Sequence, residues 1–230
     1  MLERTVPEGR SKTLRIGVLA SGRGSNLQAI IDAIEARTLQ ATIALVLSNK
    51  QEAQALERAR RHGAPDVFLD PKPYAGQPDS REVYDRAILD VLKKHEVDLV
   101  ILAGYMKIVT PVLIKAYENR MMNIHPSLLP SFPGLEAQKK ALDWGVKLTG
   151  CTVHFVTEGV DEGPIIIQAS VPVLEGDTTE SLSARILEQE HRIYPRAIQL
   201  YAEGRLQVEG RRVRVSGVSS SGAAHLTYPV

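Results

Sequence analysis

LRIGVLASGRGSN, residues 14–26, is the stretch that decides the fold. Its first seven residues form an apolar run that is typical of a buried strand, and a glycine-rich turn follows at once. After the turn, apolar residues recur with the spacing of an amphipathic helix, at Leu27, Ile30, Ile31 and Ile34. A strand, a glycine-rich turn and a helix in this order predict an α/β unit that can bind an anion at the start of the helix.

The Gly-x-Gly pair in this turn does not specify its ligand, because a tight turn in which Ser25 or Asn26 caps the helix would also explain it. In a dinucleotide fingerprint a third glycine would follow, but that position holds Leu27. The next expected strand ends in LSNK, residues 47–50, without the acidic residue that binds a ribose diol. We therefore expect a phosphate-monoester site rather than a site for NAD.

The composition is that of an ordinary globular protein, since 43% of the 230 residues are hydrophobic and 24% are charged. The net charge of +1 argues against a nucleic-acid partner bound through a large basic surface. No apolar run approaches the ~20 residues of a membrane span, and the first 13 residues lack the apolar core of a signal peptide. A single cysteine, Cys151, allows no internal disulfide, so we expect a reducing, cytoplasmic location.

Strand and helix patterns alternate along the first half of the chain. We expect strands at 42–47, 66–69, 98–103 and 120–122, and helices at 51–61, at 80–92 and from 111 onward. This alternation predicts an α/β fold of the Rossmann-like kind, with a mostly parallel central sheet and helices on both faces.

The pattern changes in the second half. After a helix expected at 137–144, two strands at 150–156 and 164–173 are joined directly by a polar loop, so the sheet should become mixed. Pro195 should kink or restart the long helix expected at 178–202. We expect one domain, residues 14–215, between short tails at 1–13 and 216–230, with residues 205–214 as a last edge strand.

NIHPSLLPSFPG, residues 123–134, is the stretch most able to carry chemistry. If the strand before it continues, Asn123 and His125 point the same way, and Pro126 then ends regular pairing. Open α/β sheets bind ligands at such strand exits. The alternative is that the prolines only turn the chain.

Asp161, on a separate loop, is the third candidate. A carboxylate beside His125 would favour the imidazolium and raise its pKa, and the amide of Asn123 could donate to a developing oxyanion. This set suits acyl transfer, with the nucleophile coming from a substrate. Taken alone, Asp161 also fits a solvated loop acid.

Other reactive side chains have ordinary explanations. Thr152 and His154 share one face of their expected strand, where a histidine is more often structural. We expect Cys151 to lie in the core and Trp144 to serve packing. No residue spacing indicates a metal site.

NIHPSLLP, residues 123–130, resembles the signature of the 10-formyltetrahydrofolate-dependent formyltransferases. Other segments in the same order, from residue 14 to about residue 206, are similar to the members of that family that formylate glycinamide ribonucleotide. These segments are SGRGSNL (21–27), SRE (80–82), LAGYM (102–106), HFVT (154–157), DEGP (161–164) and QEHRIYP (189–195).

The resemblance implies a reaction and its co-substrate. The primary amine of the glycinamide ribonucleotide would attack the formyl group of 10-formyltetrahydrofolate, giving the formylated ribonucleotide and tetrahydrofolate in purine synthesis. It implies that the partners are small molecules rather than nucleic acid or a membrane, and that no metal is needed. It leaves open whether the protein forms a homodimer. Residues 14–122 would form a nucleotide-binding half, and residues 123–215 a folate and catalytic half.

The resemblance also implies residue roles. Asn123 and protonated His125 would stabilise the oxyanion, and Asp161 would keep His125 charged and assist proton transfer, with Thr152 and His154 as accessory residues. The phosphate would be held by Gly24, Ser25 and Asn26, and the ribose by Glu190. The folate pocket would be lined by Arg81, Met106, Lys107, Ile108, Val109, Asn123, Thr157, Glu158, Gly159, Val160 and Asp161.

Two positions depart from the family's pattern. Lys107 stands where relatives often have arginine, and Glu136 stands where some have histidine or aspartate, so Glu136 is not assigned to the site. The alternatives are a tRNA formyltransferase, a formyltetrahydrofolate hydrolase and a non-catalytic nucleotide-binding module. The first adds a C-terminal barrel and the second an N-terminal domain, and the intact trio argues against the third.

Overall fold

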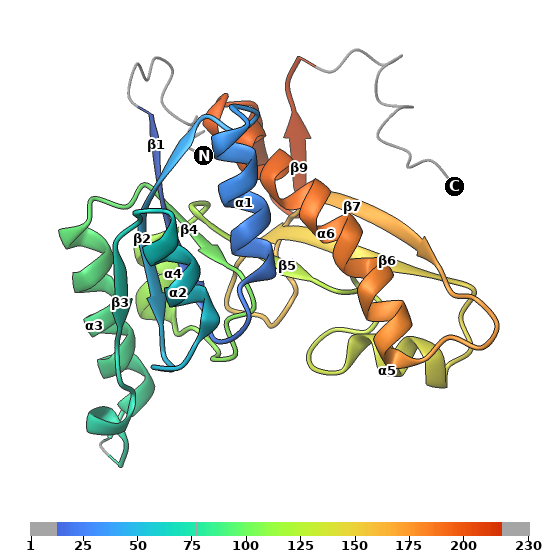
Figure 1. Cartoon of the computed structure of the whole chain (residues 1–230), viewed down its shortest axis with the longest axis horizontal. Helices are drawn as coiled ribbons and strands as arrows, with labels where there is room; N and C mark the ends of the chain where they lie inside the picture. Colours follow the sequence, from blue (N-terminus) through green and yellow to red (C-terminus); the bar gives the residue numbers. More distant parts are fainter. Residues whose placement is uncertain (1–12, 77, 218–230) are drawn as a thin grey trace.

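A nine-stranded sheet crosses the part of the chain that the computed structural model describes, residues 13–76 and 78–217 (Figure 1). The strands are β1 (Leu14–Ala20), β2 (Ala41–Ser48), β3 (Asp66–Phe68), β4 (Leu99–Leu102), β5 (Met121–His125), β6 (Leu148–Phe155), β7 (Ile165–Pro172), β8 (Leu206–Glu209) and β9 (Arg212–Val215). The helices are α1 (Ser25–Glu35), α2 (Gln54–Arg61), the short 3-10 helix η1 (Lys72–Tyr74), α3 (Ser80–Lys94), α4 (Pro111–Ala116), α5 (Ala137–Asp143) and α6 (Thr179–Ala202).

The strand order is β3-β2-β1-β4-β5-β6-β7-β9-β8. Pairing is parallel from β3 to β5 and antiparallel from β5 through β6 to β7. The prediction of a mostly parallel sheet that becomes mixed in its C-terminal half is therefore confirmed. Strand β5 is the boundary, because it is parallel to β4 on one side and antiparallel to β6 on the other.

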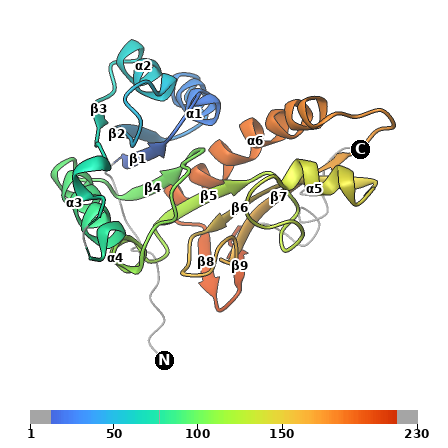
Figure 2. The same ribbon diagram turned by 90° about the horizontal axis from the view of Figure 1, so that it is seen from below.

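Helices cover both faces of the sheet. Helices α1, α2, α5 and α6 lie on one face and α3 and α4 on the other, as Figure 2 shows. Successive residues of β4 enter opposite cores, since Leu99 and Ile101 pack under the first layer and Val100 and Leu102 under the second. Burial on both faces explains why the inner strands are continuous apolar runs rather than alternating ones.

Helix α6 runs as one element across Pro195, so the helix does not restart there, while the alternative expectation, a kink at Pro195, stays a prediction. A proline inside a helix removes one backbone donor, and burial of its neighbours offsets that loss. The fully buried Tyr194 shows how, because its hydroxyl lies 2.9 Å from the carbonyl oxygen of Leu102 and 3.0 Å from that of Met122. The helix is thereby joined to the ends of β4 and β5.

Three further expectations differ from the structure. The edge strand expected at 205–214 is a hairpin, because Gly210, with φ of 59°, turns the chain between β8 and β9. Helix α2 begins at Gln54 rather than at residue 51, and Trp144, expected to pack, is 78% exposed. The N-terminal tail lies outside the described residues except for Thr13, and so does the C-terminal tail except for residues 216 and 217. No helix in the described parts is long and apolar enough to cross a membrane.

Removing the Tyr194 hydroxyl tests this junction. We expect Tyr194→Phe to lower the free energy of unfolding by about 1–3 kcal/mol, because buried carbonyl groups lose a hydrogen-bond partner. Urea denaturation measures the change. In the control, Tyr117→Phe, a single 3.3 Å bond to the carbonyl of Val97 is lost, so the change should be smaller. Equal losses in both variants would contradict this account of α6.

Candidate active site

Strand β5 brings Asn123 and His125 to one face of the sheet, because it continues through residue 125. In the antiparallel register, His154 of β6 lies opposite Asn123, and Thr152 lies opposite His125. Directly opposed residues of neighbouring strands share a face. Four of the predicted site residues are therefore gathered by one strand pair.

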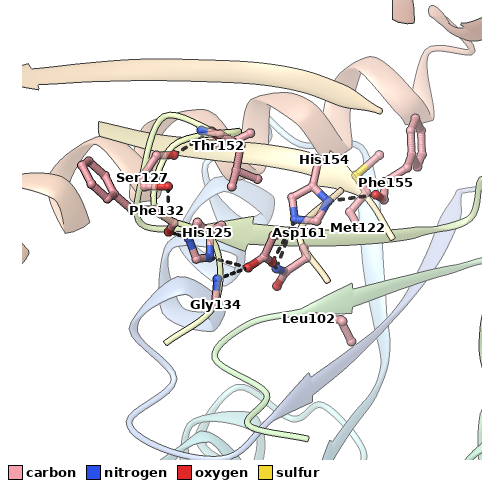
Figure 3. A network of polar contacts seen from close by, with 12 residues as sticks. Leu102, Met122, His125, Ser127, Phe132, Gly134, Thr152, His154, Phe155 and Asp161 are labelled. Atoms are coloured by element: carbon pink, nitrogen blue, oxygen red, sulfur yellow. Dashed lines mark hydrogen bonds and ion pairs between the residues drawn. The ribbon is translucent and has the colours of Figure 1, made fainter. Parts of the chain in front are cut away.

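Asp161 reaches the same place from the loop between β6 and β7 (Figure 3). Its Oδ2 lies 3.2 Å from Nδ1 of His125 and accepts a 2.8 Å hydrogen bond from the backbone N–H of Gly134. Its Oδ1 lies 3.5 Å from Nδ2 of Asn123. Asp161 has φ of 57°, a backbone conformation that is uncommon outside glycine and clusters at functional sites. The structure thus joins the three predicted catalytic residues in one cluster.

The loop after β5 fixes the other side of the His125 ring. Nε2 of His125 lies 2.9 Å from the carbonyl oxygen of Phe132, so this nitrogen carries the proton and donates. Thr152 is fully buried and shapes the loop, since its hydroxyl donates to the carbonyl of Ser127 and accepts from the N–H of Leu129. Gain or loss of a proton by His125 therefore occurs at Nδ1, beside Asp161.

The pKa of His125 shifts in the direction opposite to the one expected from the sequence. Burial lowers the pKa of His125 below its ordinary value of 6.5, although the Phe132 carbonyl and the Asp161 carboxylate act the other way. The expectation of a raised pKa for His125 is wrong, because only 5% of the residue is exposed and desolvation exceeds the effect of the carboxylate.

Asp161 stays ionised despite its position. Burial alone would raise the pKa of Asp161, but the hydrogen bond from the Gly134 amide and the nearby imidazoles of His154, at 3.7 Å, and His125 lower it to about 2. His154 is itself oriented, because its Nδ1 donates a 2.9 Å bond to the carbonyl of Phe155. Its Nε2 is then free to accept from Nδ2 of Asn123 at 3.2 Å.

The glycine-rich turn lies at the start of α1, but neither Ser25 nor Asn26 caps the helix. Gly24 occupies the N-cap with φ of 70°, and a Cβ added there would lie 2.9 Å from the Cα of Ala55. Backbone shape therefore requires glycine at this position. No side chain caps the helix start, so side chains leave the first N–H groups of α1 unused, as at helix starts that bind anions.

Asn26 and Glu190 meet directly, although they are far apart in sequence. Nδ2 of Asn26 donates a 2.7 Å hydrogen bond to Oε2 of Glu190. Both side chains are buried, and burial raises the pKa of Glu190 to about 7, with Asn26 opposing that shift. A phosphate contact by Asn26 is left to its backbone N–H, because its amide side chain binds Glu190.

Several of the residues predicted to bind the folate line one cavity of about 520 Å³. Arg81, Met106, Lys107 and Ile108 line this cavity, whereas Val109 and the loop at 157–161 do not. Sequence reasoning missed the seven other lining residues, which are Pro71, Lys72, Tyr74, Ala75, Ser80, Tyr84 and Asp85. The Lys107 ammonium lies 5.3 Å from the centre of the Tyr84 ring, a cation–π contact. In the sequence, Lys72 and Tyr74 were marked only as a basic and an aromatic residue in a proline-rich loop, which did not indicate a binding site.

Ser21 joins the turn to the segment that lines this cavity. Its hydroxyl donates to Oδ1 of Asn49 at 2.6 Å and accepts from the N–H of Met106 at 2.9 Å. Its own N–H donates to the carbonyl of Gly104 at 3.1 Å. The glycine-rich turn and the segment that lines the cavity are therefore joined by two of these hydrogen bonds. Among residues 13–76 and 78–217, no group of three or more histidine, cysteine, aspartate or glutamate side chains could hold a metal ion.

The class of protein follows from a family comparison. A family model described as Formyl transferase matches residues 14–198, which is most of the chain. The chain belongs to the formyl transferase family.

Similar proteins point to one activity within this family. Phosphoribosylglycinamide formyltransferase of Escherichia coli (strain K12) is 45% identical over 204 residues, which cover 89% of this chain and 94% of that protein. The structure of glycinamide ribonucleotide transformylase 1 from Symbiobacterium toebii matches with a TM-score of 0.86 at 56% identity, covering 90% of this chain and 95% of that one. The chain also spans 20% of the trifunctional purine biosynthetic protein adenosine-3 of Gallus gallus, at 47% identity.

The raised pKa of Glu190 makes stability depend on pH. Between its ordinary value of 4.5 and about 7, the folded protein holds a proton that the unfolded chain has released, so stability falls as pH rises. Relative to Glu190→Gln, the wild type should lose on the order of 3 kcal/mol between pH 4.5 and 7.

Urea denaturation of both proteins at several pH values measures this difference. Glu188→Gln is the control, because Glu188 is exposed on the same helix. A pH-independent difference between wild type and Glu190→Gln would show that Glu190 is not buried as described.

Proposed function

We propose that this chain transfers the formyl group of 10-formyltetrahydrofolate to the primary amine of glycinamide ribonucleotide, releasing tetrahydrofolate, in purine biosynthesis. The observation that carries the proposal is the buried Asn123–His125–Asp161 cluster at the exit of β5 in a formyl transferase fold. Its full-length relatives carry the name of this activity.

The cluster matches the needs of this reaction. Amine attack on the formyl carbon forms a tetrahedral centre with an oxyanion and a charged nitrogen. Asn123 Nδ2 and, once it has been protonated, His125 Nδ1 are the donors proposed for the oxyanion, and removal of one such donor typically costs about 3 kcal/mol. The 3.5 Å contact of Asn123 with Asp161 is long, so the developing oxyanion can replace it.

Proton transfer is assigned to His125 and Asp161. Asp161, with a pKa of about 2, is ionised near neutral pH, so it can orient the attacking amine and pass the amine proton on to Nδ1 of His125, 3.2 Å away. Because its pKa is lowered, His125 is neutral near neutral pH, so Nδ1 first takes up the proton that leaves the amine and then donates it to the oxyanion or the leaving nitrogen. Phe132 keeps the opposite nitrogen occupied, which directs this exchange to the side of Asp161.

The two substrates are assigned to the two sides of the Ser21 junction. Gly24, Ser25 and Asn26 would bind the ribonucleotide phosphate, and Glu190 its ribose. Arg81, Lys107 and the exposed apolar side chains of Met106 and Ile108 would bind the folate, with Val109 and Thr157, Glu158, Gly159 and Val160 of the Asp161 loop nearer its reacting end. These sets draw on both 14–122 and 123–215, so one domain is proposed rather than one half for each substrate.

The setting of the enzyme is part of the same proposal. The reaction as written has no step that needs a metal ion, and its partners are two small molecules. Cys151 is buried and free, in keeping with a cytoplasmic location. A monomer and a homodimer are both compatible with a site whose proposed residues come from one chain.

A direct assay tests the activity. Purified protein should formylate glycinamide ribonucleotide with 10-formyltetrahydrofolate as donor, and release of tetrahydrofolate should require the ribonucleotide. Hydrolysis of the donor without an acceptor, or formylation of aminoacyl-tRNA at a comparable rate, would instead support one of the alternative activities in this family.

Single substitutions in the cluster test the assigned chemistry. We expect His125→Ala and Asp161→Asn each to lower kcat by roughly 10²–10⁴-fold, because each removes a positioned acid–base group. The KM for the ribonucleotide should change little, since neither residue lies at the phosphate turn. His95→Ala, after the C-terminus of α3, is the control. Turnover like that of the wild type in either variant would refute these roles.

Arg81→Ala tests the folate assignment. The folate carries glutamate carboxylates, so we expect its KM to rise roughly tenfold while the KM for the ribonucleotide stays unchanged. Arg86→Ala is the matched control, because Arg86 lies on the same helix but pairs with Glu82 outside the cavity. A rise in the ribonucleotide KM alone would mean that the two subsites are exchanged.

A further inference from the structure

A second cavity, of about 420 Å³, lies along the first turns of α1, between α2 and α6. It is lined by Ser25, Gln28, Ala29, Asp32, Arg58 and His191. Ser25 belongs to the phosphate turn, so this cavity opens directly beside the proposed position of the phosphate. None of the residues that line the folate cavity contributes to it.

Arg58, on α2, is the side chain that links the cavity to the turn. Its Nε donates a 2.9 Å hydrogen bond to the carbonyl oxygen of Arg23, inside the glycine-rich turn. Its Nη1 donates a 2.9 Å bond to Oε1 of Gln28, and Nε2 of Gln28 donates to Oδ1 of Asp32. The Arg58 guanidinium is therefore oriented by two hydrogen bonds, and one of them ties it to the backbone of the glycine-rich turn.

Charge explains why an arginine is needed at this place. A phosphate monoester carries about −1.5 to −2 charges near neutral pH, whereas the N–H groups of a helix start offer only about half a positive charge. Asp32 adds negative charge at the same cavity. These two hydrogen bonds use two of the five N–H donors of Arg58, and the other three have no partner among the described residues.

Unpartnered polar atoms flank the same turn. Oδ1 of Asn26 and Nε2 of His191 are buried and have no hydrogen-bond partner among the described residues. Buried polar atoms are usually paired, and such orphans are expected where a polar ligand binds. Oδ1 of Asn26 is an acceptor, so it suits a hydroxyl donor of the substrate rather than its phosphate.

We propose that Arg58 determines specificity for the phosphate of the ribonucleotide substrate. It positions the turn through the carbonyl of Arg23 and supplies positive charge that the backbone alone lacks. This inference rests on the proposed function, because it deepens the assignment of the turn to the substrate phosphate.

Kinetics with and without the phosphate test the role. In Arg58→Ala and Arg58→Gln, we expect the KM for glycinamide ribonucleotide to rise about tenfold or more with little change in kcat, as for loss of a charge-assisted contact. With glycinamide riboside, which lacks the phosphate, the same substitutions should change nothing. Equal losses with both substrates would mean that Arg58 only supports the fold, and would overturn the proposal.

A charge-matched control excludes a general electrostatic effect. Arg61→Ala removes the same charge from the same helix, but Arg61 pairs with Glu57 on the surface and does not line the cavity. Its KM for the ribonucleotide should be that of the wild type. A rise like that of Arg58→Ala would overturn the proposal in favour of net charge.

Direct binding separates this inference from the proposed reaction. Calorimetry of inorganic phosphate, which needs no turnover, should give about tenfold weaker binding to Arg58→Gln than to the wild type. If the wild type binds phosphate through Arg58 but does not formylate the ribonucleotide, the proposed function fails and the role of Arg58 stands. If the wild type is active and Arg58→Gln binds phosphate equally well, only the role of Arg58 fails.

Discussion

The contact between the Asp161 carboxylate and the imidazole of His125 is the interaction on which the site depends. The carboxylate is only 10% exposed, and it is kept ionised by the hydrogen bond from the Gly134 amide and by the two neighbouring imidazoles. A buried carboxylate without such partners would take up a proton and lose its role. The positions of Asn123, His154 and the loop after β5 therefore matter mainly through this one charge.

The sheet supplies that arrangement through the double pairing of β5. Parallel pairing with β4 places the exit of β5 at the edge where α/β proteins bind ligands. Antiparallel pairing with β6 places Thr152 and His154 opposite His125 and Asn123. A one-residue slip between these strands would move the opposing side chains to the other face, so the register is a requirement of the chemistry.

Much of this architecture could be predicted from local patterns. The apolar runs and helical spacing predicted the alternation and the mixed second half, and the NIHPSLLP stretch with Asp161 predicted the residues that the structure gathers. Motif resemblance rather than spacing assigned roles to Glu190 and Arg81, because neither has a local pattern that marks it. Trp144 was misjudged because the pattern of a helix does not say whether an aromatic faces a neighbour or solvent.

The misjudged features share a physical origin in tertiary environment. The pKa of His125 depends on desolvation, which no sequence pattern reports, and the carboxylate beside it indicated the opposite direction. The Phe132 carbonyl and the Gly134 amide are backbone groups, so residue type alone did not reveal their part in the site. Helix α6 crosses Pro195 because the buried Tyr194 next to it is held by two strand ends.

The central claim is that Asn123, His125 and Asp161 surround the carbon that is transferred. A crystal structure with the ribonucleotide and a non-transferable analogue of the formyl folate tests it most directly. The account predicts the oxygen that stands for the formyl oxygen within about 2.7–3.2 Å of Asn123 Nδ2 and of a ring nitrogen of His125, with the substrate amine beside Asp161. An analogue whose reacting atom lies away from these three residues, with both substrates bound, would contradict the account.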